Sequence, residues 1–111
     1  MKLVFYTDLF IPKRFAGYTV GFIILIRPAY KDDVGLLAHE STHVKQFWRS
    51  FGLFGFLYGV SKKYRLKYEA EAYRVQLTYC SEDKINLFAK FLVDNYNLGI
   101  TIEEALTALK S

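Results

Sequence analysis

The sequence predicts a single α+β domain spanning residues 1–111, mostly helical, with three to four helices and a small β-sheet beside the helix that carries both histidines. Its 111 residues suffice for one hydrophobic core but not for two domains. An apolar fraction of 52%, with ten Phe and nine Tyr, indicates that this core is well filled. Short β-branched runs come first, and longer segments with helical spacing follow.

The N-terminal quarter predicts two strands. Residues 2–6 have a short β-compatible pattern, and an irregular connection containing Pro12 and Gly17 follows them. Residues 19–27 are dense in β-branched and aromatic side chains and end at Pro28. We therefore expect them to form one strand that is largely covered on both faces.

Residues 34–51 predict the first long helix, because their apolar side chains recur at 3.6-residue spacing. Asp32 or Asp33 can cap its start, and Gly52 fits its end. Glycines then interrupt a Phe-rich stretch over residues 52–60. This compact apolar connection could line a cleft, but we expect it to cover the core.

The remaining segments predict further helices. Residues 63–79 contain no helix breaker and form a second long helix. A serine and two acidic residues open the next helix, over residues 81–96. Thr101 and Glu104 form a capping box for a final helix, over residues 101–109.

Both histidines lie in one stretch that reads H-E-x-x-H, His39-Glu40-Ser41-Thr42-His43. A helical step of 100° per residue places the two imidazoles within about 40° of each other, with Glu40 nearby. Two imidazoles one turn apart can hold Zn²⁺ and leave room for a third ligand and a water. Zinc lowers the pKa of that water toward about 7, and Glu40 can take its proton and deliver it to a leaving amine. The motif predicts zinc-dependent peptide hydrolysis; two surface histidines on a helix are the alternative.

The third protein ligand must be a carboxylate or the single cysteine, because the chain has no other histidine. Glu69 and Glu71 lie 200° apart on a helix, so only one can point inward. Glu69 has mostly apolar neighbours one turn away, whereas Glu71 can pair in solvent with two cations of its own helix, Lys67 and Arg74. We expect Glu69 to bind zinc; alternatively it forms a structural ion pair with Arg65.

These two helix motifs resemble those of zincin metallopeptidases of the gluzincin-like kind, in which H-E-x-x-H is followed by E-x-x-A on a later helix. The second motif here is Glu69-Ala70-Glu71-Ala72. Residues 36–46 and 69–76 are also similar to small metallopeptidases encoded by bacteria and phages. The resemblance covers roughly residues 17–76 and implies a minimal zincin-like fold. It also implies the roles of four residues: zinc ligands His39, His43 and Glu69, and catalytic base Glu40.

One position departs from this family pattern. Many relatives follow the alanine of E-x-x-A with an aspartate that supports a histidine ligand, and this chain has Tyr73 there. A phenol can hydrogen-bond an imidazole or a ligand carboxylate but supplies no charge. Tyr73 is therefore a candidate for supporting a ligand or for stabilising an oxyanion, and Arg65 is the other candidate for the oxyanion.

A noncatalytic module stabilised by zinc, such as a small phage accessory protein, is the main alternative function. A structural zinc site should be closed by a fourth protein ligand. Cys80 follows Glu69 by eleven residues, about three turns, and is therefore too far along a straight helix. The residues thus favour an open site, with a peptide or protein as substrate.

Charge and targeting patterns complete the predictions. The net charge of +4 is modest, and the basic cluster of residues 62–67 usually forms a solvated face. The cluster indicates no clear nucleic-acid partner. Nucleic-acid binding that depends strongly on salt and persists without zinc would support the alternative of a basic nucleic-acid-binding protein. Charged residues interrupt any signal-peptide pattern, and apolar runs stay far below the roughly 20 residues of a spanning helix. We therefore expect a cytoplasmic protein without a transmembrane segment.

Overall fold

Three short strands and five α-helices make up the described part of the chain, which in this computed structural model is all 111 residues except the side chain of Glu82. The predicted class, mixed α and β but mostly helical, is confirmed. The elements in order are β1 (Leu3–Tyr6), β2 (Gly17–Val20), β3 (Ile23–Ile26), α1 (Val34–Arg49), α2 (Leu53–Val60), α3 (Lys62–Leu77), α4 (Ile85–Asn95) and α5 (Ile102–Lys110).

The sheet has the order β1-β3-β2, with β1 parallel and β2 antiparallel to β3. The prediction of a single strand over residues 19–27 is wrong, because this region belongs to a β-hairpin. Val20 pairs with Ile23 across a two-residue loop, in which Gly21 has a φ of 61°. Two-residue hairpin loops favour glycine at such positive φ values, so Gly21 reverses the chain inside the β-branched run.

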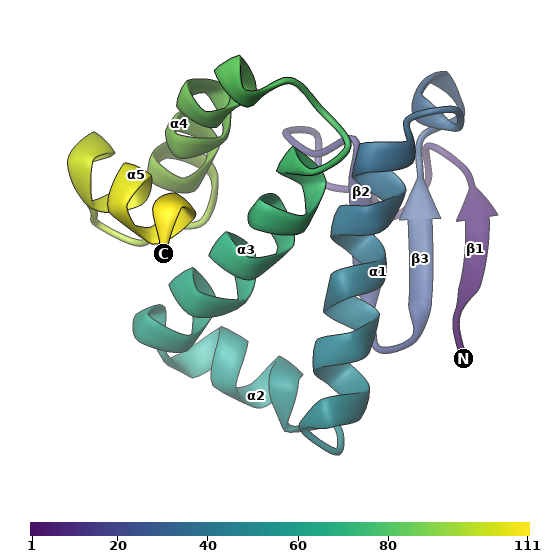
Figure 1. The fold of residues 1–111 in the computed structure, drawn as a ribbon. Helices are drawn as coiled ribbons and strands as arrows, with labels where there is room; N and C mark the ends of the chain where they lie inside the picture. The colour runs from purple at the N-terminus through teal and green to yellow at the C-terminus, as the bar shows by residue number, and fades with distance from the viewer.

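The elements form successive layers (Figure 1): α1 lies against the sheet, α3 lies beside α1, and α4 and α5 cover the other side of α3. Two hydrophobic clusters fill these layers. One joins the sheet to α1, with Ile24 and Ile26 almost fully buried. The other joins α3, α4 and α5 around Tyr73, Phe88 and Leu92. Between the clusters, α1 and α3 bury polar side chains against each other, which we call the polar seam: His39, His43, Gln46 and Glu69.

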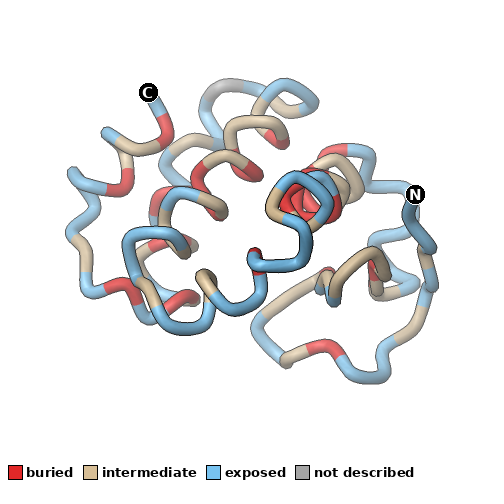
Figure 2. Tube along the Cα trace, turned by 90° about the horizontal axis from the view of Figure 1, so that it is seen from below, coloured by how far each residue is buried: buried red, intermediate tan, exposed pale blue. Residues whose placement is uncertain are grey.

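The connection predicted over residues 52–60 is instead an eight-residue helix, α2. Gly52 ends the α1 turn with a φ of 86°, and the Ser50 hydroxyl accepts a hydrogen bond from the backbone N–H of Phe54. Such a capped start allows a short helix to form. Phe54 is the one buried residue of α2, so most of this helix is coloured as exposed where it crosses between α1 and α3 (Figure 2). The inner side of α2 nevertheless covers part of the core, because Phe54 is buried and Tyr58 packs against the cluster of α3, α4 and α5.

The predicted caps are largely confirmed. Asp33 accepts a hydrogen bond from Leu36 N at the start of α1, and Thr101 and Glu104 form the reciprocal capping box of α5. The helix predicted from residue 81 begins with a 3₁₀ turn, and α4 proper starts at Ile85. Among the described residues, no helix has the length and apolarity needed to cross a membrane.

Candidate metal centre

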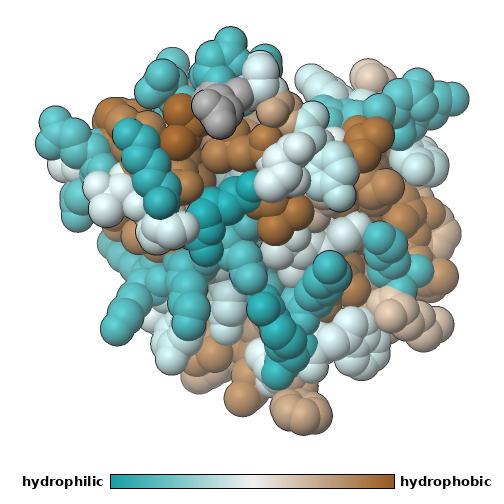
Figure 3. Space-filling view, viewed as in Figure 1, coloured by the Kyte–Doolittle hydropathy of each residue, from teal (hydrophilic) through white to brown (hydrophobic). Residues whose placement is uncertain are grey.

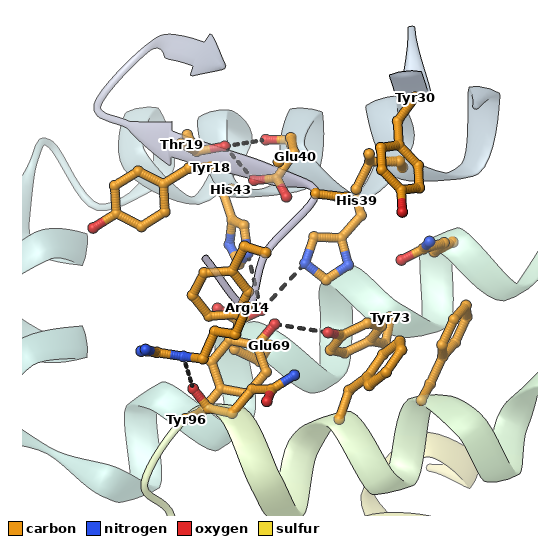
Figure 4. Close-up of a pocket in the computed structure, with 18 of the residues that line it drawn as sticks. Arg14, Tyr18, Thr19, Tyr30, His39, Glu40, His43, Glu69, Tyr73 and Tyr96 are labelled. Atoms are coloured by element: carbon orange, nitrogen blue, oxygen red, sulfur yellow. Dashed lines mark hydrogen bonds and ion pairs between the residues drawn. The ribbon is translucent and has the colours of Figure 1, made fainter. Parts of the chain in front are cut away.

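Two imidazoles from α1 and one carboxylate from α3 meet in the polar seam. His39 and His43 point from one face of α1 toward Glu69 (Figure 4). The Oε1 atom of Glu69 lies 3.2 Å from Nε2 of His39 and 3.1 Å from Nε2 of His43. All three residues are buried, and one ligand atom from each lies within 4.8 Å of the others. The structure thus brings together the three residues predicted to bind metal.

These distances suit a tetrahedral zinc ion. Zinc bonds of about 2.0–2.2 Å at tetrahedral angles separate the ligand atoms by roughly 3.3 Å or slightly more. The two N···O distances are close to that separation. Among the described residues, no fourth His, Cys, Asp or Glu joins the group, and Cys80 stays outside it. The donor set therefore fits zinc with an open coordination position.

The electrostatics of the three residues favour a cation between them. Burial alone would lower the pKa of His43, but the Glu69 carboxylate raises it to about 9. Burial would likewise raise the pKa of Glu69, but the imidazoles of His43 and His39 hold it well below its usual range. Metal-free protein therefore keeps an anionic Glu69 beside a protonated His43 at neutral pH. A zinc ion would take the place of that proton.

Hydrogen bonds fix the tautomer of His43. Gln46 Nε2 donates to Glu71 Oε1 at 2.7 Å and to the carbonyl of Tyr68 at 3.0 Å. Since both partners can only accept, the amide oxygen of Gln46 must face Nδ1 of His43, 2.8 Å away. Nδ1 therefore carries the hydrogen in the neutral ring, and the Nε2 lone pair points to the metal position.

Glu71 stabilises the position of the Gln46 side chain. Its carboxylate accepts hydrogen bonds from Arg49 on α1, at 2.7 Å for the closest contact, and from Gln46. The Arg49 bond helps to lower the pKa of Glu71 despite its partial burial, which acts in the opposite direction. The predicted solvent pairing with cations of its own helix is thus wrong, because Arg74 donates to the carbonyl of Ala108.

Replacing Gln46 by leucine should weaken zinc binding by roughly 10- to 100-fold, the usual effect of losing a hydrogen bond to a ligand histidine. The change removes the acceptor for His43 Nδ1 and the donor to Glu71. Competition with a chromogenic chelator would measure the affinity. Lys45→Leu, at the exposed neighbouring position, is the matched control and should bind zinc as wild type does. Equal affinities in both variants would contradict the support role of Gln46.

The second oxygen of Glu69 is held by a residue that sequence reasoning missed. Tyr58 on α2 donates its hydroxyl hydrogen to Glu69 Oε2 at 2.6 Å. Burial raises the pKa of Tyr58, so the phenol stays protonated as a donor. Arg65, the alternative partner of Glu69, donates instead to backbone carbonyls, including those of Tyr58 and Tyr96. The ion-pair alternative is therefore wrong.

Glu40 lies on the same helix but is held by the sheet. The Thr19 hydroxyl on β2 donates to Glu40 Oε1 at 2.6 Å. Gly17, on the same strand, leaves room for the carboxylate, because a Cβ there would lie 3.3 Å from both Cγ and Oε2 of Glu40. Oε2 accepts no hydrogen bond from the described residues. The arrangement fixes the side chain while leaving one carboxylate oxygen free to accept a proton.

Tyr73 touches the centre through its ring. The ring packs edge-on against His39 with centroids 4.3 Å apart, and its hydroxyl pairs with that of Tyr96 at 2.7 Å. Burial raises the pKa of both phenols. Nδ1 of His39 is buried and has no hydrogen-bond partner among the described residues. His39 is thus positioned by aromatic packing and by the contact of its Nε2 with Glu69, and an oxyanion role for Tyr73 stays a prediction.

The ligands and Glu40 line a cleft of about 770 Å³. Side chains of β2, α2 and α4 surround it, and the exposed residues Arg14, Tyr18 and Tyr30 also line it (Figure 4). No family model, curated protein or solved structure matches this chain. The candidate site therefore rests on its own residues and their geometry.

Proposed function

We propose that this protein is a zinc-dependent hydrolase, specifically a metallopeptidase. The observation that carries the proposal is the meeting of Glu69 Oε1 with both imidazole Nε2 atoms in a cleft that also holds Glu40. His39, His43 and Glu69 would hold the zinc ion, which would supply a Lewis acid for acidifying water and polarising a substrate carbonyl.

In this proposal Glu40 handles the protons. Its Oε1 accepts from Thr19, which leaves Oε2 to take a proton from the attacking water. The same oxygen then delivers the proton to the departing amine. Glu40 is not a member of the metal-binding group, as a general base requires. The cleft, about 770 Å³ with many aromatic side chains, is large enough for several residues of a peptide or protein substrate.

A paired measurement tests the function. Elemental mass spectrometry should find near one zinc per chain, and a peptide library incubated with the zinc-loaded protein should be cleaved. Cleavage that stops with a chelator and returns with zinc supports the proposal. Zinc without cleavage of any library member would favour the noncatalytic, zinc-stabilised module. No zinc after reloading would overturn both.

Zinc binding should release about one proton per chain at neutral pH, because His43 must lose its proton before Nε2 can bind the metal. The reason is the raised pKa of His43, about 9 in the metal-free protein. Calorimetric titrations in buffers with different ionisation enthalpies would count the released protons. Binding without proton release would contradict the protonated His43.

The same raised pKa sets the pH dependence of the metal-free fold. A protonated His43 stabilises the fold fully below its unfolded pKa of about 6.5, and this contribution is lost as the pH rises through about 9. Thermal denaturation of the metal-free protein should therefore show a declining midpoint across this window.

A further inference from the structure

One stretch of the chain concentrates positive charge. Residues 41–68 hold six of the 15 cations and none of the 11 acidic residues. The net charge of this stretch therefore exceeds the +4 of the whole chain. The six cations are Lys45, Arg49, Lys62, Lys63, Arg65 and Lys67. Arg49 is paired with Glu71 and Arg65 donates to backbone carbonyls, so the four lysines, all exposed, carry the charge that would attract an anionic partner.

The same stretch exposes a group of large apolar side chains, which we call the apolar ridge: Phe51, Leu53, Phe56 and Val60. Phe51 is 95% exposed, and Phe56 and Val60 are each 66% exposed. Hydrophobic atoms gather along the lower edge of the molecule (Figure 3), where Figure 1 shows α2. A Cβ at Gly55 or Gly59 would meet no atom within 4 Å. The ridge is thus open to solvent.

Phe51 combines two unfavourable features. Its φ of 54° lies in the left-handed region, which an aromatic residue rarely adopts, and its side chain is almost entirely in contact with solvent. Strained backbone of this kind occurs frequently at functional positions. Here it aims an apolar ring outward at the junction of α1 and α2.

We propose that the apolar ridge docks onto the surface of an anionic lipid bilayer. Helices that lie in the membrane interface combine exposed aromatic and aliphatic side chains with lysines beside them, and exposed Lys62 and Lys63 directly follow the ridge. A second copy of the chain would bring the same positive charges together, which is unfavourable. The four ridge side chains line neither the cleft nor the smaller pocket beside Glu71, and exposed side chains of this kind can enter a deformable bilayer without a shaped partner surface.

Membrane docking does not depend on the proposed hydrolase activity, but it would set the orientation of the cleft relative to the lipid surface. α2 contributes Phe54, Gly55 and Tyr58 to the cleft lining, and Tyr58 also holds Glu69. Docking through the outer side of α2 would therefore place the cleft beside the lipid surface.

Co-sedimentation with vesicles tests the proposal. Wild type should sediment with vesicles of phosphatidylcholine and phosphatidylglycerol in equal parts, and the bound fraction should fall as salt is added. Phe51→Ser with Phe56→Ser should lower partitioning at least about tenfold, because two exposed rings no longer enter the bilayer. Lys62→Glu with Lys63→Glu should lower it by a factor of about five or more per lysine.

Phe10→Ser is the matched control. Phe10 is 85% exposed with a φ of 65°, but it follows β1 at the end of the sheet away from α2 (Figure 1). This variant should bind vesicles as wild type does. The proposal is overturned if wild type stays in the supernatant, or if the double Phe variant sediments equally well. It is also overturned if light scattering shows a lipid-free dimer that the double Phe variant abolishes, since a second copy would then cover the ridge.

Discussion

Glu69→Ala should lose bound zinc and should lower the stability of the metal-free fold by about 3 kcal/mol, the lower end for breaking a buried charged pair. The carboxylate is buried between two imidazoles and the hydroxyl of Tyr58. Its removal deletes the proposed third metal ligand and leaves a buried His43 without its counter-charge. Elemental mass spectrometry would count the zinc, and urea denaturation after metal removal would give the stability.

Glu71→Gln is the matched control for this experiment. It removes the same charge from the same helix but retains an amide oxygen that can accept from Gln46. Arg49 is more than half exposed, so the loss of its pairing should cost little. Zinc retained in Glu69→Ala, or lost only in Glu71→Gln, would show that the ligand assignment is wrong.

Glu40→Gln should retain zinc and the fold, whereas hydrolysis should fall by roughly 10²- to 10⁴-fold, the usual contribution of a general acid–base. The amide is similar in shape and can still accept from Thr19, but it cannot take a proton from water. Initial rates on a cleaved library peptide and zinc content would be measured on the same preparation.

Ser41→Ala controls for a general effect of changing this part of α1. The Ser41 hydroxyl accepts from Lys2 rather than from any member of the metal-binding group. The hydrolysis rate of Ser41→Ala should stay close to that of wild type. An undiminished hydrolysis rate in Glu40→Gln would show that Glu40 is not the general base. Loss of zinc from this variant would instead show that Glu40 takes part in metal binding.

The candidate metal centre could be predicted from local rules because its parts lie on two regular helices. The spacing of His39 and His43 fixes their common face, and the apolar neighbours of Glu69 turn it inward. The contact of Gln46 with His43 could also have been predicted, since residues three apart on a helix lie on one face. Its hydrogen bond with His43 follows from that spacing.

Other contacts of the site depend on the tertiary arrangement, and no local sequence pattern predicts them. Tyr58 reaches Glu69 because α2 turns back between α1 and α3, and a segment rich in glycine and phenylalanine does not specify that path. Thr19 reaches Glu40 across the boundary between sheet and helix. Gly21 did mark the hairpin, but the dense β-branched residues around it suggested one continuous strand.

The polar seam also determines how α1 and α3 align. An apolar interface tolerates alternative alignments, because one aliphatic side chain can replace another in the packing. Sliding α3 along α1 by one turn, about 5.4 Å, would separate Glu69 from both imidazoles and Gln46 from Glu71. Each buried polar group left unpaired costs about 1–3 kcal/mol. The seam therefore selects one register of the helix pair out of several that hydrophobic packing alone would allow.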